Sequence, residues 1–323
     1  MANIGNVTPV TILTGYLGAG KTTLLNHLLT AQHGQKYALI INEFGELGID
    51  DQLVVAADEE IFEMNNGCVC CTVRGDLIRI ITGLLKRSQK FDGIIVETTG
   101  LAAPAPVAQS FFADADLQQK TRLDAIITVV DAKNIQRQLA ETSEAAAQIA
   151  FADVILLNKT DLVSAEELDA AEQKIRSINR FCELIRTTEG VINPAQVLGR
   201  QAFELEKILA VEPGFLTNGH HHDHNTEVTS LSLSTDEAID PELFEEWMAV
   251  LLREKGADIF RSKGVLVIEG ENKRLVFQAV HMQFRIAFGQ NWRPREKRQS
   301  QLVFIGRNLD FASLKRGFLN CVA

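Results

Sequence analysis

The sequence has little positive charge and no long apolar run, and both shortages exclude classes of protein. Its 323 residues contain 32 lysines and arginines against 42 aspartates and glutamates, for a formal net charge of −10. This balance argues against non-specific binding to nucleic acids, which depends on neutralising phosphates. No apolar run approaches the length that crosses a bilayer, and no secretory leader is evident. We therefore expect a soluble cytoplasmic protein whose partners include neither nucleic acid nor membrane.

Cysteine is also scarce, and the five cysteines are unevenly distributed. Cys68, Cys70 and Cys71 fall within four positions, which is a poor framework for disulfides and a good one for a metal ion. Thiolates suit Zn²⁺ and Cu(I), and three protein ligands leave one position open for exchange. The alternative is that one of the three cysteines is buried and the other two have no role in metal binding. Cys182 and Cys321 have apolar neighbours, and we expect both to be buried and inert.

Short apolar runs alternate with amphipathic segments over the first two-thirds of the chain. This alternation predicts an α/β domain with a doubly wound, mostly parallel sheet. The expected strands are residues 10–14, 37–41, 61–64, 94–97, 125–130, 154–157 and 184–187. The expected helices are residues 22–30, 76–87, 106–112, 141–150 and 165–179. Ser164 and Glu167 form a capping box for the last of these helices.

The pattern changes near residue 211. Residues 211–226 have no periodicity and contain His220, His221, His222 and His224. Because neutral imidazoles bind Zn, Cu, Ni and Co, this stretch is either a weak metal-collecting site or a polar linker. From residue 227 the expected order is β-α-β-β-β-α, with Asp240 and Pro241 starting the first helix and the second strand at residues 265–268. The sequence thus predicts a P-loop domain (1–210), a linker (211–226) and a small α+β domain (227–323).

A phosphate-binding motif lies between the first expected strand and the first expected helix. Residues 15–22 fit the P-loop pattern G-x-x-x-x-G-K-[ST], and this is the context that the motif needs. The glycines let successive N–H groups point into one concavity, and the helix N-terminus adds a partial positive charge. Lys21 is expected to reach the β- and γ-phosphates and Thr22 to ligate Mg²⁺. The expected nucleotide contacts here are Gly15, Gly18, Ala19, Gly20, Lys21, Thr22 and Thr23.

Two later motifs complete the predicted nucleotide site. Glu97 ends an apolar strand and is expected to hold Mg²⁺ or its water shell, and Gly100 brings an N–H near the γ-phosphate. Residues 158–161, Asn-Lys-Thr-Asp, follow another strand. A carboxylate there accepts two hydrogen bonds that guanine donates and adenine cannot. We therefore expect GTP, with Asn158, Lys159 and Asp161 at the base.

A polar loop from Asn42 to Asp51 lies between the P-loop and Glu97. It is either a switch that senses the γ-phosphate or a surface loop.

Together these motifs resemble the CobW family of metal-handling P-loop GTPases. The matching residues are 15–22, 42–45, 67–71 with the pattern Gly-Cys-Val-Cys-Cys, 97–100 and 158–161. The His-rich stretch and the last domain are similar to the family's C-terminal half, so the resemblance covers nearly the whole chain. It implies a SIMIBI-type G domain, slow GTP hydrolysis and delivery of a metal to a client protein. It also implies an acidic residue near the cysteines, a role that Glu43 or Glu46 could fill.

The resulting hypothesis is a GTP-hydrolysing metallochaperone with GTP, Mg²⁺ and Zn²⁺ as ligands, although Co²⁺ or another transition metal also suits the site. Lys21, Glu97 and Glu43 are the expected catalytic residues. The expected ligands are Thr22 and Glu97 for Mg²⁺, and Cys68, Cys70, Cys71, Glu43, His220, His221, His222 and His224 for the transition metal. The alternatives are a metal buffer or sensor with regulatory nucleotide, a cobalamin-synthesis or nitrile-hydratase insertion factor, and a P-loop kinase or other ATP-dependent enzyme.

Overall fold

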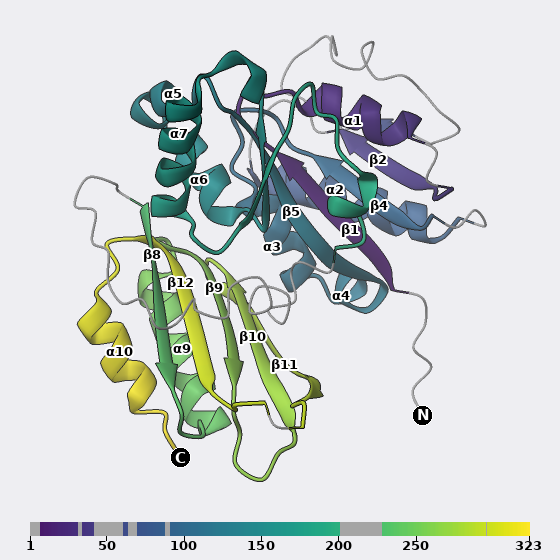
Figure 1. The fold of residues 1–323 in the computed structure, drawn as a ribbon. Helices are drawn as coiled ribbons and strands as arrows, with labels where there is room; N and C mark the ends of the chain where they lie inside the picture. The colour runs from purple at the N-terminus through teal and green to yellow at the C-terminus, as the bar shows by residue number, and fades with distance from the viewer. Residues whose placement is uncertain are drawn as a thin grey trace. The chain divides into compact units, whose positions relative to one another are not determined.

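The computed structural model describes residues 7–31, 34–41, 61–63, 70–87, 91–200, 228–294 and 296–323, and of residues 61–63 and 70–74 it describes the backbone alone. The chain divides into two units, with the main boundary between residues 203 and 204. Each unit contains its own sheet (Figure 1). Within the described ranges, no helix is both long and apolar enough to span a bilayer.

In the part of the chain that the structure describes, the first unit is built on a seven-stranded parallel sheet. Its strands are β1 (Thr8–Thr14), β2 (Tyr37–Ile41), β3 (Ile61–Glu63), β4 (Gly93–Glu97), β5 (Thr121–Asp131), β6 (Val154–Asn158) and β7 (Glu183–Arg186). Their order is β3-β2-β4-β1-β5-β6-β7, so the direction of the winding reverses at β1. Sheets of this kind bind ligands beyond the carboxyl ends of the strands at such a reversal.

Helices cover both faces of this sheet (Figure 1). They are α1 (Lys21–Thr30), α2 (Cys70–Leu85), α3 (Ala105–Ala113), α4 (Ala115–Lys120), α5 (Ile135–Glu141), α6 (Ser143–Phe151), α7 (Ala165–Ile178), and the short 3₁₀ helices η2 (Thr160–Leu162) and η3 (Pro194–Gln196). Leu24 and Leu28 of α1 pack in one core with Ile127 of β5. The next residue, Thr128, donates its hydroxyl to the Gln148 carbonyl of α6 at 2.8 Å. Burial on both faces explains why these strands are continuous apolar runs.

The doubly wound parallel sheet is confirmed, but several helix limits differ from the prediction. Helix α2 begins at Cys70, six residues before the expected start, so Cys70 and Cys71 belong to the helix and not to a turn before it. The helix expected at residues 141–150 is present as α6 and begins two residues later, at Ser143, whereas the sequence pattern did not predict α5. Thr142 has extended backbone, with φ −142° and ψ 143°, and it separates α5 from α6.

At the starts of α7 and α4, one prediction is confirmed and one helix is found that was not predicted. The capping box of α7 is confirmed, because Ser164 N–H donates to Glu167 Oε2 at 2.8 Å and Glu167 N–H donates to Ser164 Oγ at 3.2 Å. Helix α4 is absent from the predicted helices. Asp114 caps it by accepting a hydrogen bond from the Leu117 amide at 2.9 Å, and it also ends α3.

Over residues 228–294 and 296–323, the second unit has a five-stranded antiparallel sheet in the order β11-β10-β9-β12-β8. Its elements are β8 (Val228–Thr235), α9 (Pro241–Lys255), β9 (Ile259–Leu266), β10 (Lys273–Val280), β11 (Gln283–Asn291), β12 (Ser300–Arg307) and α10 (Phe311–Leu319). Both helices share a core with one face of the sheet, with Phe244 and Phe318 among their buried residues. The predicted start of α9 is confirmed, since Asp240 accepts hydrogen bonds from the Glu242 and Leu243 amides.

The predicted strand order of this unit is wrong at two places. It lacks β11, which pairs with β10 at the sheet edge and packs Phe284 and Ile286 against the core. It also starts the second strand at residue 265, whereas β9 begins at Ile259. Arg261 and Lys263 interrupt the apolar pattern of β9, although both side chains are buried.

Candidate functional site

The P-loop residues form the turn between β1 and α1. Gly20 precedes α1 with φ 106° and ψ 25°, in the left-handed region, and Gly15 has φ 143°. A Cβ on Gly20 would lie 2.5 Å from Asn158 Nδ2, and a Cβ on Gly15 would lie 2.3 Å from the Val129 carbonyl oxygen. Both positions therefore need glycine for space as well as for conformation.

Lys21, the first residue of α1, is 9% exposed. Its Nζ donates to the Gly15 carbonyl oxygen at 2.9 Å, which brings the ammonium over the turn. A cation beside a helix N-terminus suits an anionic group such as a phosphate. Thr22 follows as a half-buried residue, and Thr23 is exposed. The chain thus places Gly15, Gly18, Ala19, Gly20 and Lys21 in one compact turn, as predicted from their spacing.

Asn158 joins the P-loop to two other segments. Its side chain is almost fully buried at the carboxyl end of β6. Nδ2 donates to the Ala19 carbonyl oxygen at 3.0 Å. Oδ1 accepts from Thr187 Oγ1 and from the Gly190 amide, both at 3.1 Å. These three hydrogen bonds make the asparagine a brace between the P-loop and the loop after β7.

Lys159 also connects to the P-loop. Its backbone has φ 61°, in the left-handed region, and its Nζ donates to the Gly18 carbonyl oxygen at 2.7 Å. The same ammonium forms an ion pair with Asp131 Oδ2 at 2.8 Å. Asp161 follows in η2 and is exposed, so its carboxylate is open to solvent beside the motif.

Asp131 is a buried carboxylate at the carboxyl end of β5. Burial raises its pKa, but hydrogen bonds from Lys159 and Asn134, the Lys159 charge and the Lys133 amide outweigh burial and leave the pKa below its ordinary value. Asp131 is therefore ionised at neutral pH.

The segment after β4 is tied to the P-loop strand. Glu97 is 8% exposed at the end of β4 and lies in register with Leu13 of β1. The next residue, Thr98, donates its hydroxyl to Thr14 Oγ1 at 2.8 Å. A Cβ on Gly100 would lie 2.7 Å from the Leu17 backbone nitrogen, so this turn packs directly on the P-loop. The predicted neighbourhood of the P-loop and residues 97–100 is thus present.

Sequence reasoning missed four residues that hold these parts together through side-chain or backbone hydrogen bonds: Asp131, Gln148, Thr187 and Gly190. Gln148 of α6 donates from Nε2 to the Gly100 and Ala102 carbonyl oxygens, both at 3.1 Å. For Asp131 a signal exists, because an acidic residue follows a buried parallel strand at the same sheet edge as Asn158. The others depend on contacts between distant segments, and local spacing does not reveal such contacts.

The cysteine segment leaves the same sheet edge as the P-loop. In β2, Ile41 pairs with Glu63 at the end of β3 and with Glu97 at the end of β4. The chain from Glu63 to Cys70 at the start of α2 has seven steps and spans at most about 25 Å. The structure gives Cys70 and Cys71 as backbone positions in the first turn of α2.

Several predicted ligands lie outside the described residues, namely Cys68, Glu43, His220, His221, His222 and His224. Among the residues that are described, no group of three or more His, Cys, Asp or Glu is placed to hold a metal ion. Cys182 and Cys321 are free thiols at 3% and 2% exposure, which confirms that both are buried.

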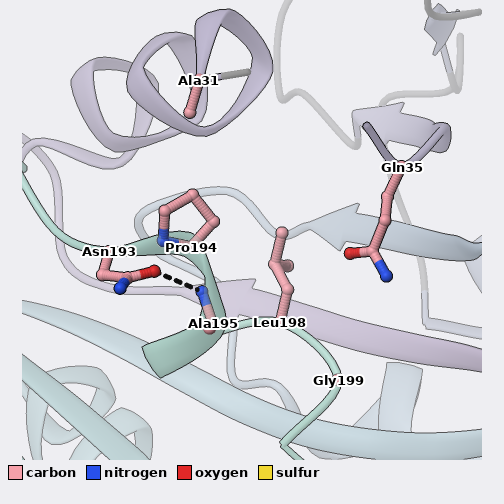
Figure 2. Close-up of a pocket in the computed structure, with 7 residues that line it drawn as sticks. All are labelled: Ala31, Gln35, Asn193, Pro194, Ala195, Leu198 and Gly199. Carbon is pink, nitrogen blue, oxygen red and sulfur yellow. Dashed lines mark hydrogen bonds between the residues drawn. The ribbon is translucent and has the colours of Figure 1, made fainter. Parts of the chain in front are cut away.

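A cavity of about 510 Å³ lies away from this edge, at the C-terminal end of α1. It is lined by Ala31, Gln35, Asn193, Pro194, Ala195, Leu198 and Gly199 (Figure 2). The Asn193 side chain accepts from the Ala195 amide at 3.1 Å and so starts η3. Since α1 has ten residues, its length of about 15 Å separates the cavity from the P-loop. The cavity is not part of the nucleotide site.

Comparison with known families accounts for both units. A family profile described as the CobW/HypB/UreG nucleotide-binding domain matches residues 9–186. A second profile, the cobalamin synthesis protein cobW C-terminal domain, matches residues 228–322.

Individual relatives are similar over nearly the whole chain. The zinc chaperone YjiA of Escherichia coli (strain K12) is 36% identical over 97% of this chain and 98% of its own. The zinc-regulated GTPase metalloprotein activator 1 of Schizosaccharomyces pombe is 34% identical over 93% of this chain and 82% of its own. The crystal structure of Zn(II)-bound YjiA GTPase from E. coli matches with a TM-score of 0.78 at 32% identity, covering 98% of this chain and 99% of that one. These matches confirm the predicted resemblance and fold class.

Proposed function

Because the chain belongs to the CobW family of P-loop GTPases, we propose that it is a GTP-hydrolysing metallochaperone that carries zinc and delivers it to a client metalloprotein. Cys68, Cys70 and Cys71 hold the cargo ion, since thiolates suit Zn²⁺ and three of them leave a position free for exchange. The relatives named zinc chaperone and zinc-regulated GTPase support zinc over the other transition metals.

The observation that carries this proposal is the shared sheet edge. Leu13 before the P-loop is in register with Glu97, and Glu97 and Glu63 are both in register with Ile41. The P-loop follows β1 and the segment with the cysteines follows β3, so both leave the same edge of the sheet, with β2 and β4 between these two strands. Nucleotide and metal can influence each other through this edge if the metal binds the two nucleotide states with different free energies.

The nucleotide roles follow from the geometry of the turn. The amides of residues 15–20 and the Lys21 ammonium hold the phosphates, and Asp161 recognises guanine. The donor set also fits Mg²⁺, because the Thr22 hydroxyl and the Glu97 carboxylate are hard oxygen ligands that follow the adjacent strands β1 and β4. When bound, Mg²⁺ supplies neutralisation of charge on the β- and γ-phosphate oxygens. Thr98 and Gln148 orient the chain that follows Glu97, since their hydroxyl and amide fix its turn.

The test is the zinc affinity of the full chain with a non-hydrolysable GTP analogue and with GDP, measured by competition with a chromophoric chelator. Coupling between two sites changes an affinity by about 5- to 150-fold, and a ratio in this range between the two nucleotides is the expected result. Equal affinities would remove the coupling and with it the chaperone cycle.

Matched cysteine variants separate the cargo site from other thiols. Replacing Cys68, Cys70 and Cys71 together by serine should abolish tight zinc binding and leave GDP binding intact. Replacing the buried Cys182 by alanine is the control and should leave zinc affinity unchanged. Tight zinc binding by the triple variant would exclude the cysteine segment as the cargo site.

A further inference from the structure

Asp131 is not among the residues expected to touch the nucleotide, yet its carboxylate accepts four hydrogen bonds. Its Oδ1 accepts from the Lys133 amide at 3.0 Å and the Asn134 amide at 3.2 Å, and its Oδ2 accepts from Asn134 Nδ2 at 2.9 Å. These donors all come from the turn directly after β5. The carboxylate is therefore fixed in position by its own segment before any contact with Lys159 is made.

The fourth donor to Asp131 comes from a different segment. Lys159 Nζ donates to Asp131 Oδ2 at 2.8 Å and to the Gly18 carbonyl oxygen at 2.7 Å. The Asp131 side chain is 3% exposed and the Lys159 side chain 32% exposed. One ammonium thus spans from the phosphate-binding turn to the end of β5, and it comes from the motif that is expected to bind guanine.

The ion pair restrains a side chain that is otherwise free to move. A lysine has many rotamers, and one hydrogen bond to a carbonyl oxygen holds it less firmly than a hydrogen bond and an ion pair together. Strands β5 and β6 are adjacent, and Asp131 is in register with Asn158, so the pair joins the ends of neighbouring strands. The contact adds a second link between residues 158–161, which are expected to bind guanine, and the P-loop. The first link is the hydrogen bond from Asn158 to Ala19.

We propose that Asp131 is a positioning residue that holds Lys159 across the P-loop and thereby slows the release of guanine nucleotide. A nucleotide that spans both segments dissociates more slowly when the two segments are pre-organised with respect to each other. Asp131 acts through Lys159 and makes no contact with the nucleotide. This inference rests on the proposed nucleotide site.

The experiment measures the dissociation rate of a fluorescent GDP analogue from the full chain by displacement with excess GDP. For Asp131→Asn we expect an increase of about 10- to 100-fold, the range that corresponds to losing a hydrogen bond between charged groups. Lys159→Met should give a similar increase. The double variant Asp131→Asn/Lys159→Met should be no faster than Lys159→Met alone, because Asp131 acts only through that lysine.

Asp124→Asn is the matched control. Asp124 is a fully buried carboxylate on the same strand, β5, where it accepts from the Arg200 amide at 2.9 Å and from the Thr11 hydroxyl of β1 at 3.4 Å. Its removal lowers stability without reaching the P-loop, so the dissociation rate should stay within about 2-fold of the unmodified protein. An equal increase in Asp124→Asn would show that any loosening of β5 has this effect and would overturn the proposal.

Two other results would also overturn it. They are an unchanged rate in Asp131→Asn, and rate increases that multiply in the double variant. If Asp131→Asn does not fold, Asn134→Ala takes its place, because it removes the amide that donates to Asp131 Oδ2 and, besides that, only an exposed hydrogen bond from Arg137 to Asn134 Oδ1 among the contacts of the described residues. It should raise the rate by about 2- to 10-fold, and an unchanged rate would contradict the proposal. Failure of the unmodified chain to bind GDP would overturn the nucleotide site itself, whereas normal binding with an unchanged Asp131→Asn rate overturns this inference alone.

Discussion

Replacing Asn158 by alanine should weaken both the first unit and its nucleotide site. Asn158 is 2% exposed, and its side chain bonds to Ala19, Thr187 and Gly190 at 3.0 to 3.1 Å. The alanine variant leaves a buried carbonyl oxygen, hydroxyl and amide without these partners. It also leaves a cavity next to Gly20, whose absent Cβ would point at Asn158 Nδ2.

The magnitude follows from the three lost hydrogen bonds. Each buried polar group left unsatisfied costs about 1–3 kcal/mol, and water entering the cavity recovers part of this, so we expect the unfolding free energy to fall by about 3 kcal/mol. With a urea m value of about 3 kcal/mol/M, the unfolding midpoint of the first unit should fall by about 1 M. GDP affinity should fall by at least about 10-fold, because the link between the P-loop and the loop after β7 is lost.

The positions of the two tryptophans allow the two units to be followed separately. Trp247 and Trp292 both belong to the second unit, so tryptophan fluorescence reports on that unit alone. Circular dichroism in the far ultraviolet reports on both. The expected result is an Asn158→Ala protein whose fluorescence transition in urea is unchanged and whose dichroism transition begins at lower urea.

Asn193→Ala provides the control for this prediction. Asn193 is an exposed asparagine that caps η3 through one hydrogen bond, and its loss should cost about 1 kcal/mol without changing GDP affinity. A dichroism transition in Asn158→Ala that matches the unmodified protein, together with unchanged GDP affinity, would refute the reasoning.

Three further predictions use other parts of the structure. Gly20→Ala should reduce GDP affinity by at least about 100-fold, because its φ is 106° and its Cβ would lie 2.5 Å from Asn158 Nδ2. In fluorescence titrations Gly18→Ala should reduce GDP affinity much less, by about 1 kcal/mol that reflects backbone strain, since no atom of the described residues beyond its chain neighbours lies within 4 Å of its Cβ. Asp161→Asn should shift the preference from guanine to xanthine nucleotides in competition assays, and a retained guanine preference would exclude Asp161 from base recognition. Burial raises the pKa of Cys321 from 9.0 to about 11, so the thiol is favoured in the folded state and unfolding free energy should fall as pH rises between these values. Urea unfolding across this range tests the sign, and Cys321→Ala should remove this part of the pH dependence.

The sequence predicted those features that depend on residues close together in the chain. The P-loop, the Ser164 and Glu167 capping box and the Asp240 cap are each set by neighbours within a few positions. Local spacing also failed in informative ways. Strand β11 was not predicted, although Phe284, Ile286 and Phe288 alternate as in a strand. This apolar row has only three members and is partly exposed, so it is hard to distinguish from a loop that follows a hairpin.

The contacts that position the site could not be predicted, because they join distant segments. Gln148 reaches back 48 residues to Gly100, and Lys159 reaches Gly18 across 141 residues. A buried glutamine in a helix has no local pattern that distinguishes it from other helical glutamines. Only the sheet order, with β1 between β4 and β5, brings these side chains to one edge.

The central place of β1 has a consequence for synthesis of the chain. The two neighbours of β1 are β4 and β5, which end at residues 97 and 131, and the brace from Asn158 to Ala19 also needs the loop at Gly190. When only the first hundred residues have emerged from the ribosome, the P-loop is therefore present without β5, Asn158 and the loop at Gly190, which contact or brace it in the folded unit. Nucleotide capture must wait until almost two hundred residues have emerged, so bound GTP or GDP marks a nascent first unit that has finished folding.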